Sequence, residues 1–386
     1  MSSDIATGRP MTVAVVTPWY PEPDRPWEGT FIANPCHALR KLGVRMRVFK
    51  LTGRPPAVRV NEIDPDTGRA IAPSGILIRS SRHLASVINS GWLWSESCDV
   101  VLVEEVWTSI LLRKARTPPQ VVVLHGRQPM TTSGARTDPI RRSIIAASLR
   151  RASALIAVGA GILEDLPPDL RQVCTVVPNG VLLDAFPRRA VSASERVRAA
   201  DFPRLVTVGN VDSNKNQETV LRAFASIRDT WPTASWSVVG DGPERRRLEG
   251  LRDQLGHHDR IRFTGRAAPA QVAAILNRSD LFVMPSRIES FGCAYLEAMA
   301  VGVPTIVPRS AGLAALIDDD RYLHDPDNGA EIVAKANAIL SSPTQYEQAV
   351  AFGLALAERW TWQAHAESLA DVLRKSVAVR EAVPTP

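Results

Sequence analysis

Residues 287 to 304 of the chain read Arg-Ile-Glu-Ser-Phe-Gly-Cys-Ala-Tyr-Leu-Glu-Ala-Met-Ala-Val-Gly-Val-Pro. Two apolar segments, Leu281 to Met284 and Thr305 to Val307, flank this stretch and have the length and composition of buried strands. The pattern predicts a loop after Pro285, and then a helix of about nine residues that begins near Cys293. Because α/β proteins bind ligands at the carboxyl ends of parallel strands, this unit also predicts a binding site.

The loop and the helix start have the chemistry of a site for a nucleotide joined to a sugar. Gly292 has no side chain, so a ligand can approach the backbone closely. The N–H groups of Phe291, Gly292 and Cys293 would lie at a helix N-terminus, which favours anions such as a diphosphate. Glu289 and Glu297 supply two carboxylates that can accept hydroxyl groups. Each glutamate taken alone also fits a solvated surface position.

The residues Glu289-Ser-Phe-Gly, together with Glu297, resemble the E-x7-E signature of the retaining glycosyltransferases of family GT4. The resemblance implies that Glu289 contacts hydroxyls of the donor sugar and that Glu297 contacts the nucleotide ribose. It also implies the GT-B fold, an α/β architecture of two Rossmann-like, doubly wound parallel-sheet domains facing a cleft. The donor-site residues that the signature covers are Glu289, Ser290, Phe291, Gly292, Cys293 and Glu297.

Length and composition indicate that the chain has two domains. Its 386 residues are enough for two domains, and the polar stretch from Arg188 to Phe202 indicates the boundary. We expect an acceptor-binding domain over 1–190, a nucleotide-sugar-binding domain over 191–359, and a crossover helix and tail over 360–386 that packs on the first domain. The segment from Gln345 to Val379 is predicted to be helical, with Trp360 and Trp362 buried where the last long helix begins.

Charge and cysteine content restrict the partners and the compartment. Up to Glu195 the chain has 24 Lys and Arg against 17 Asp and Glu, and after it 22 against 23. A basic first half fits an anionic membrane surface, and it also fits arginines that only decorate helices, such as Arg150 and Arg151 in a predicted helix over 138–151. The absence of RNA-binding signatures disfavours nucleic acid. Four scattered cysteines and a polar N-terminus predict a cytoplasmic protein, and the basic first half also fits a peripheral position at the inner membrane face.

The first half begins with a βαβ pattern whose first loop is long. Met11 to Thr17 and Val44 to Leu51 are predicted strands, and residues 52–75 a loop or hairpin. No G-x-G-x-x-G turn occurs, so a dinucleotide cofactor is disfavoured. Gly29 and Thr30 open the intervening helix, with Thr30 as its N-cap. In GT-B enzymes such a glycine lines the cleft on the acceptor side, although a helix-start glycine needs no ligand.

His125 and Gly126 follow a short strand, Val121 to Leu124, at another strand end. An imidazole there can hydrogen-bond a sugar or a carbonyl, but a structural role fits equally well. GT4 enzymes often have His-Gly at this place, so the resemblance implies an acceptor-side and catalytic role for His125. A helix is also predicted over 80–98. Pro178-Asn179-Gly180-Val181 resembles the P-N-G-V-D turn of the family, with Leu182 in place of the aspartate.

The second half restarts the pattern at the strand Leu205 to Val208. Lys215 lies at a strand-to-helix transition, where a phosphate-binding lysine belongs, and it is one of only six lysines in the chain. The segment from Gly209 to Lys215 resembles the G-R-x-x-x-x-K motif of GT4, whose cations neutralise the donor diphosphate. Asn210 occupies the arginine position, and an amide cannot neutralise phosphate. We therefore expect Lys215 to act in catalysis together with Glu289 and His125.

Two further turns are expected at the donor site by resemblance. Gly240 begins a G-x-G-P turn, in which Pro243 is placed to start a helix. Gly265 and Arg266 belong to a loop that touches the nucleotide base in the family. The run from Asp318 to Asp320 is interpreted as a solvated turn, and the family needs neither a divalent ion nor any other cofactor.

The sequence therefore predicts a retaining, metal-independent hexosyltransferase. It would move a hexose or N-acetylhexosamine from a UDP-sugar, with GDP-mannose as the second choice, to a hydroxyl of a lipid-linked or small-molecule acceptor. One alternative is a GT-B protein with impaired chemistry, owing to Asn210, that binds an anionic membrane surface or a nucleic acid. Another is an epimerase or a phosphorylase on the same scaffold, which the complete E-x7-E pattern disfavours.

Overall fold

A computed structural model describes residues 9–54, 57–71, 76–78, 98–111, 118–126 and 139–381. The chain forms two compact units. The first contains residues 1–178 and 362–386, and the second contains residues 179–361. These divisions fall after Pro178 and after Thr361, whereas the sequence placed them after 190 and after 359. The helix predicted over 80–98 lies outside the described residues.

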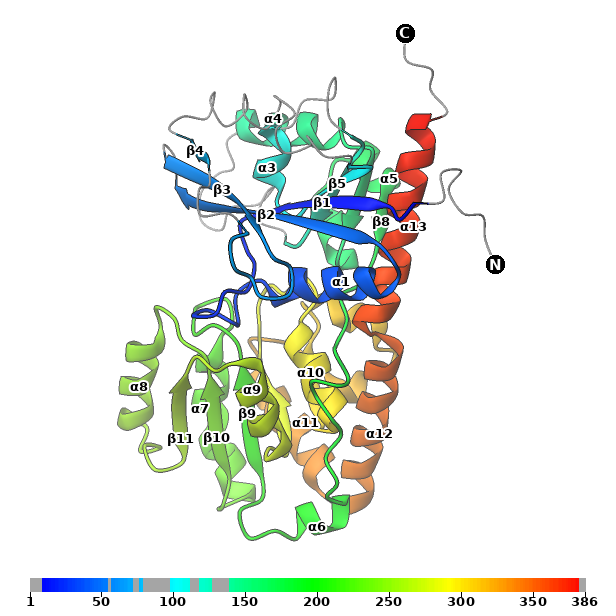
Figure 1. Ribbon diagram of the computed structural model, residues 1–386. Helices are drawn as coiled ribbons and strands as arrows, with labels where there is room; N and C mark the ends of the chain where they lie inside the picture. Colours follow the sequence, from blue (N-terminus) through cyan, green and yellow to red (C-terminus); the bar gives the residue numbers. More distant parts are fainter. Residues whose placement is uncertain are drawn as a thin grey trace. The chain divides into compact units, whose positions relative to one another are not determined.

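The first unit is built on an eight-stranded sheet with the order β4-β3-β2-β1-β5-β6-β7-β8 (Figure 1). The strands β1, β2 and β5 to β8 are parallel, while β3 pairs antiparallel with β2 and β4 antiparallel with β3. The sheet is therefore mixed rather than purely parallel, because the stretch predicted as a loop or hairpin folds into β3. The strands are β1 (Thr12–Thr17), β2 (Arg45–Arg54), β3 (Ala57–Ile63), β4 (Ile76–Ile78), β5 (Val100–Val103), β6 (Gln120–Leu124), β7 (Ala154–Ala157) and β8 (Cys174–Val176).

Helices cover both faces of this sheet. Figure 1 shows α1 on one side and α3 with α4 on the other. The C-terminal helix α13 packs against α1, β5 and β6, so it completes the core of the first unit. The helices are α1 (Thr30–Lys41), α3 (Val106–Leu111), α4 (Pro139–Leu149), α5 (Pro168–Val173) and α13 (Trp362–Glu381), with a 3-10 turn at Ala160–Asp165.

The second unit is built on a six-stranded sheet with the order β11-β10-β9-β12-β13-β14. Every recorded pairing in this sheet is parallel. The order reverses between β9 and β12, which is the place where doubly wound sheets bind ligands. The strands are β9 (Arg204–Val208), β10 (Ser235–Val239), β11 (Ile261–Gly265), β12 (Leu281–Val283), β13 (Thr305–Pro308) and β14 (Leu323–His324).

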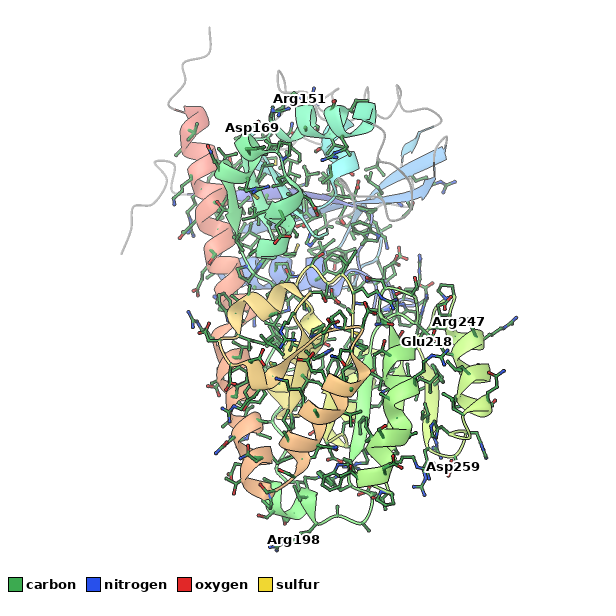
Figure 2. The ribbon with its side chains drawn as sticks, turned by 180° about the vertical axis from the view of Figure 1, so that it is seen from behind. Arg151, Asp169, Arg198, Glu218, Arg247 and Asp259 are labelled. Carbon is green, nitrogen blue, oxygen red and sulfur yellow. The ribbon has the colours of Figure 1, made fainter. Side chains whose placement is uncertain are left out.

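The helices of the second unit also lie on both faces of their sheet. Figures 1 and 2, taken from opposite sides, show α9 and α10 on one face and α7 with α11 on the other. Figure 2 also labels Glu218 of α7 and Arg247 of α8, whose side chains join the two helices at 2.6 Å. The helices are α6 (Ala193–Val197), α7 (Gln217–Thr230), α8 (Arg245–Gln254), α9 (Pro269–Asn277), α10 (Cys293–Val301), α11 (Gly329–Leu340) and α12 (Pro343–Arg359), with 3-10 turns at Gly312–Leu316 and Asp320–Tyr322.

The last long helix begins at Trp362, as predicted, after a break at Trp360, where φ is −110° and ψ is 78°. Two local predictions about the starts of helices are wrong. Thr30 is the first residue of α1 rather than its N-cap, which is Gly29 in the left-handed conformation. Pro243 precedes α8, which begins at Arg245.

Charged side chains on the surface are largely paired. Arg150, one of the predicted basic residues after α4, forms a bidentate pair with Asp169, which Figure 2 also labels. Asp320 pairs with Arg309 and Lys335, so the acidic run that ends there is a turn held by cations.

Trp362 is 3% exposed, as predicted, whereas Trp360 is only half-buried. Within the described residues, no helix is long and apolar enough to cross a membrane.

Candidate functional site

The reversal of strand order in the second unit brings two loops together, one after β9 and one after β12. Asn214 of the first loop is hydrogen-bonded through both ends of its amide to the backbone of Ile288, with distances of 2.8 and 2.9 Å. The N–H of Arg287 also donates to the carbonyl oxygen of Asn214. These bonds fix the position of Glu289, the next residue along the chain.

Asp212 shapes the first loop. Its Oδ1 accepts hydrogen bonds from the backbone N–H groups of Asn214, at 3.0 Å, and of Lys215, at 2.9 Å. Such a turn closes on a side chain instead of a backbone carbonyl, and it sets the direction in which Lys215 leaves the backbone. The sequence analysis did not identify Asp212 or Asn214, although acidic and amide side chains in a loop after a buried strand are a recognisable turn signal.

Lys215 and Glu289 form an ion pair through Nζ and Oε2. Their side chains are 17% and 16% exposed, so the pair is partly shielded from water. The two residues were predicted separately, one for a diphosphate and one for sugar hydroxyls, and the structure places them in direct contact. Without a ligand, each therefore neutralises the charge of the other.

The loop that carries Glu289 is also held from its other side. The N–H of Gly312 donates to the carbonyl oxygen of Glu289 at 2.9 Å, and the N–H of Leu313 donates to that of Phe291 at 3.0 Å. Phe291 as a whole is only 2% exposed, so it belongs to the core beneath the loop. Ser290 lies between these two anchors, and its carbonyl lies against Gly312.

Gly292 is the N-cap of α10 and has a φ of 102°. A Cβ at this position would lie 2.4 Å from the Tyr295 ring and 3.2 Å from Cγ of Glu289. The glycine therefore allows the chain to turn tightly between the Glu289 loop and the helix. The first-turn N–H groups of α10 lack partners within the helix and present the positive end of its dipole.

Glu297 and Cys293 lie one turn apart on α10. Burial raises the pKa of the Glu297 carboxyl to about 7. Burial, followed by the charges of Glu297 and Glu289, raises the pKa of the Cys293 thiol far above its usual value, so this group stays protonated at neutral pH. Asn179 donates to its Sγ at 3.6 Å. The second carboxylate of the E-x7-E pattern is thus set in an environment where charge is costly.

Three of the predicted donor-site glycines come together. A Cβ on Gly240 would lie 1.8 Å from the carbonyl oxygen of Gly209, and the N–H of Gly240 donates to the carbonyl oxygen of Gly265 at 2.8 Å. The carboxyl ends of β9, β10 and β11 can pack this closely only because the three glycines have no side chains. Asn210 and Arg266 are exposed beside them.

Arg245, which the sequence analysis did not single out, lies beside this glycine cluster. Its guanidinium is 3.4 Å from the position that a Cβ on Gly265 would occupy. The side chain pairs with Asp241 and Glu249 and donates to the carbonyl oxygen of Phe263. It is the first residue of α8 and brings a cation close to a loop where Asn210 provides none.

The residues predicted for the acceptor side lie in the first unit. Gly29 has a φ of 69°, and a Cβ there would lie 2.7 Å from the backbone of Trp19 and Tyr20. His125 follows β6, and its Nε2 lies 2.6 Å from Oε2 of Glu104, which follows the neighbouring strand β5. The sequence analysis missed Glu104, although a carboxylate directly after a buried strand is the same signal that identified His125.

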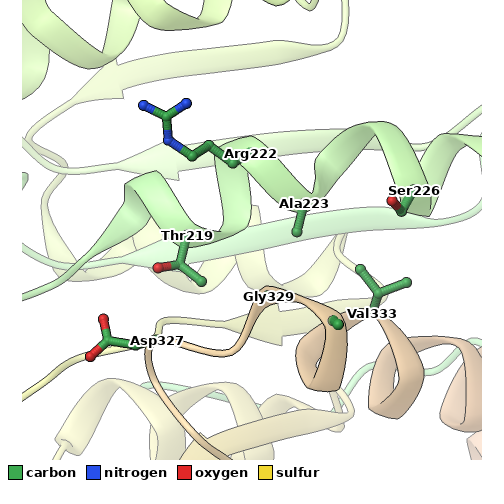
Figure 3. A pocket seen from close by; sticks show the side chains of 8 residues that line it. Thr219, Arg222, Ala223, Ser226, Asp327, Gly329 and Val333 are labelled. Atoms are coloured by element: carbon green, nitrogen blue, oxygen red, sulfur yellow. The ribbon is translucent and has the colours of Figure 1, made fainter.

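The described residues also form two adjoining pockets, of which the second is lined in part by Asp212 and Arg287. One, of about 450 Å³, lies between α7 and α11 and is lined by Thr219, Arg222, Asp327 and small side chains (Figure 3). The other, of about 390 Å³, shares those three residues and extends to Arg247 and Arg287. Lys215, Glu289 and Glu297 line neither pocket. Among the described residues, no three histidine, cysteine, aspartate or glutamate side chains are grouped to hold a metal ion.

Comparison with known proteins also divides the chain into two regions. Residues 29–185 match the family described as glycosyltransferase family 4, and residues 192–354 match glycosyl transferases group 1. The chain is 31% identical over 218 residues to a GDP-mannose-dependent alpha-(1-6)-phosphatidylinositol monomannoside mannosyltransferase of Mycobacterium tuberculosis. That match covers 53% of this chain and 56% of the relative, so it spans little more than half of either protein.

Another relative is matched over most of its length. The 2-deoxystreptamine glucosyltransferase of Streptomyces kanamyceticus is 26% identical over 349 residues, with 81% of this chain and 89% of that protein covered. Among solved structures, a sucrose-phosphate synthase from Thermosynechococcus elongatus has a TM-score of 0.74 at 20% identity and covers 96% of this chain and all of that chain. HepE of Anabaena in complex with UDP has a TM-score of 0.68 at 17% identity and covers 95% of this chain and all of that chain.

One family match falls largely in the first unit and the other lies within the second. The structural matches, at these identities, show the fold, which is the GT-B fold of those proteins. The E-x7-E carboxylates, the lysine after β9 and the glycine-lined strand ends lie in the second unit, within the region that the group 1 family covers. The chain therefore belongs to glycosyltransferase family 4.

Proposed function

We propose that this protein transfers a glycosyl group from a nucleoside-diphosphate sugar to a hydroxyl of an acceptor, with retention of configuration and without a metal ion. The observation that carries the proposal is the contact between Lys215 and Glu289 at the reversal of strand order, with Glu297 eight residues further on. A cation that can bind phosphate and two carboxylates that can accept hydroxyls therefore lie in and beside the first turns of α10.

The donor diphosphate would take the place of Glu289 as the partner of Lys215. The first-turn N–H groups of α10 would stabilise the charge that develops on the leaving diphosphate. Glu289, released from Lys215, would accept hydroxyls of the donor sugar, and Glu297 would accept those of the ribose. Arg245 lies beside Gly265 of the glycine cluster, and it would offset the missing charge at Asn210.

No covalent intermediate is part of this proposal. Cys293, the side chain at the helix start with the strongest intrinsic nucleophilicity, stays a thiol because burial raises its pKa. Transfer would instead take place on one face of the sugar, with the leaving diphosphate close to the incoming hydroxyl. Retention then follows without a protein nucleophile, and the positive charges around the diphosphate do the work that a metal ion does in other enzymes.

The donor is proposed to be a UDP-sugar, with GDP-mannose as the second candidate, and the acceptor a lipid-linked or small-molecule alcohol. The names of the relatives support both acceptor types, since one acts on a phosphatidylinositol mannoside and another on 2-deoxystreptamine. GDP-mannose appears in the name of the first, and HepE is bound to UDP.

A panel of nucleotides tests this proposal. We would measure the melting temperature with UDP, GDP, ADP and TDP and with their sugar conjugates, in EDTA. A ligand that binds only the folded protein raises the melting temperature by mass action. A shift with one nucleotide, followed by release of that diphosphate in the presence of an acceptor, would support the proposal. No shift with any of them would contradict it and favour a protein with impaired chemistry on the same scaffold.

A further inference from the structure

His125, which was predicted for the acceptor side, is in contact with a carboxylate. Glu104 follows β5 and His125 follows β6, and these two parallel strands are neighbours in the sheet of the first unit. The carboxyl ends of both strands therefore bring the two side chains to one edge. Oε2 of Glu104 lies 2.6 Å from Nε2 of His125, a distance typical of a charge-assisted hydrogen bond.

Glu104 is held rigidly and is almost completely buried. Its side chain is 3% exposed, and its backbone N–H donates to the carbonyl oxygen of Val16 in β1 at 3.1 Å. A buried carboxylate without a partner costs several kilocalories per mole, so burial of this one at a strand end requires the imidazole. The side chain of His125 is 15% exposed.

The groups packed around the pair do not compete for its proton. His365 of α13 donates through Nδ1 to the carbonyl oxygen of Pro178, and burial lowers its pKa to about 4, so it is neutral. Burial raises the pKa of the Cys36 thiol in α1, so this group is neutral as well. Phe31 contacts the imidazole edge-on, with 4.9 Å between the ring centroids.

The other ring nitrogen of His125, Nδ1, is available to accept a hydrogen bond. Nδ1 of His125 is buried and has no hydrogen-bond partner among the described residues. An ionised carboxylate only accepts hydrogen bonds, so the nitrogen that faces Glu104 carries a proton, and in the neutral imidazole Nδ1 then carries the lone pair. A buried acceptor with no donor is unfavourable, and a ligand hydroxyl would remove that cost.

We propose that Glu104 is the positioning residue that holds His125 with its proton on Nε2, so that Nδ1 accepts a hydroxyl of a bound substrate. This inference rests on the proposed glycosyl transfer and adds a residue to it. The hydroxyl belongs either to the donor sugar or to the acceptor, and both are alcohols with the same chemistry. Nδ1 is buried in this structure, so the groups packed over it would have to shift for the hydroxyl to reach it.

The first test is spectroscopic and needs no substrate. The protein labelled with 15N-histidine is compared with its His125→Gln variant, so that the resonances of His125 are assigned by difference. We expect the 15N shifts of a neutral ring with a protonated Nε2 and an unprotonated Nδ1. In Glu104→Gln, whose amide can donate as well as accept, a second tautomer should become populated. A wild-type ring protonated at Nδ1 would overturn the proposal, whether or not the protein proves to be a glycosyltransferase.

The second test is kinetic and separates the two possible substrates. Glu104→Gln keeps the volume of the side chain and should lower kcat/KM by about tenfold, as expected when a charge-assisted hydrogen bond becomes a neutral one. A rise in the KM of the donor alone would assign the hydroxyl to the donor sugar, and a rise in that of the acceptor alone would assign it to the acceptor. Unchanged kinetics for both substrates would overturn the proposal.

A matched control distinguishes positioning from loss of an ion pair. Glu62→Gln removes a carboxylate of the same sheet that pairs with Arg47 at 2.8 Å and is not in contact with His125. It should leave kcat/KM unchanged. Both variants should keep the nucleotide-dependent rise in melting temperature, because the groups that would bind the nucleotide lie in the second unit. A loss of activity in Glu62→Gln equal to that in Glu104→Gln would assign the effect to stability and overturn the positioning role.

Discussion

Lys215 and Glu289 are each the other's counter-ion when no donor is present, and this has opposite consequences for their substitution. We expect Lys215→Ala to weaken binding of nucleoside diphosphates by about 10- to 100-fold, because a hydrogen bond to a charged group is lost. Binding of the corresponding nucleosides should be unchanged. Isothermal titration with both ligands measures the difference, and equal losses for the two would contradict a phosphate-binding role.

Glu289→Gln should have a different signature. The variant frees Lys215 from its carboxylate, so a nucleoside diphosphate should bind more tightly than it does to the wild type. Transfer should nevertheless fall by about 10- to 100-fold, because an amide holds sugar hydroxyls less strongly than a carboxylate does. Titration and turnover of the same preparation test both halves. Glu218→Gln, which loses pairs with Arg222 and Arg247 in the same unit, is the control.

Glu297 makes stability depend on pH. Its pKa is raised from 4.5 to about 7 in the folded protein, so the folded state keeps a proton that the unfolded state releases. The stabilisation from this proton is present below pH 4.5 and is lost as the pH rises towards 7. The melting temperature of Glu297→Gln relative to wild type should therefore increase between pH 5 and pH 8. A difference that stays constant over this range would mean that the carboxyl titrates normally.

At the scale of elements, Gly29 decides how α1 begins. It adopts a left-handed conformation, and a Cβ would lie 2.7 Å from backbone atoms of Trp19 and Tyr20. We expect Gly29→Ala to destabilise the protein by about 2–4 kcal/mol, from both the conformation and the clash. Gly43 has a φ of 81° with no atom within 4 Å, so Gly43→Ala should cost only about 1–2 kcal/mol. Chemical denaturation of both variants compares them, and equal costs would contradict the role of the clash.

The sequence predicts the strands better than the ends of the helices. The strands around Leu281 and Thr305 are runs of buried apolar residues, and α10 begins at Cys293 as expected, because Gly292 is a strong helix-start signal. The starts of α1 and α8 lie one and two residues away from the predicted positions, because tertiary packing as well as local propensity decides where a helix begins.

The site is only partly visible in the sequence, for a similar reason. Lys215, Glu289 and Glu297 belong to motifs with fixed spacing. The amide of Asn214, in contrast, bonds a residue 74 positions away, and the pair of Glu104 and His125 spans 21 positions. Contacts of this kind depend on which strands become neighbours. The order β9-β12 and the order β5-β6 therefore have to be known before these residues can be identified.

At the scale of the whole molecule, the first unit depends on the last helix of the chain. Leu373 of α13 is fully buried, while Val379 of the same helix is 67% exposed. Leu373→Ala should destabilise the first unit by about 2–5 kcal/mol, and Val379→Ala should have almost no effect. Calorimetry should show that the transition of the first unit moves to lower temperature, while nucleotide binding is kept. Loss of nucleotide binding in Leu373→Ala would indicate that the second unit also relies on this helix.

The discontinuous first unit also has a consequence during synthesis. Residues 179–361 form one unbroken segment, whereas the first unit needs residues from both sides of it. A ribosome adds about 5–20 residues per second, so β1 to β8 emerge well before the helix that covers β5 and β6. The second unit can close its core first, although it is made later. The apolar face that α13 covers must then be shielded until α13 has been made, which makes the nascent first unit the part of this protein most in need of a chaperone.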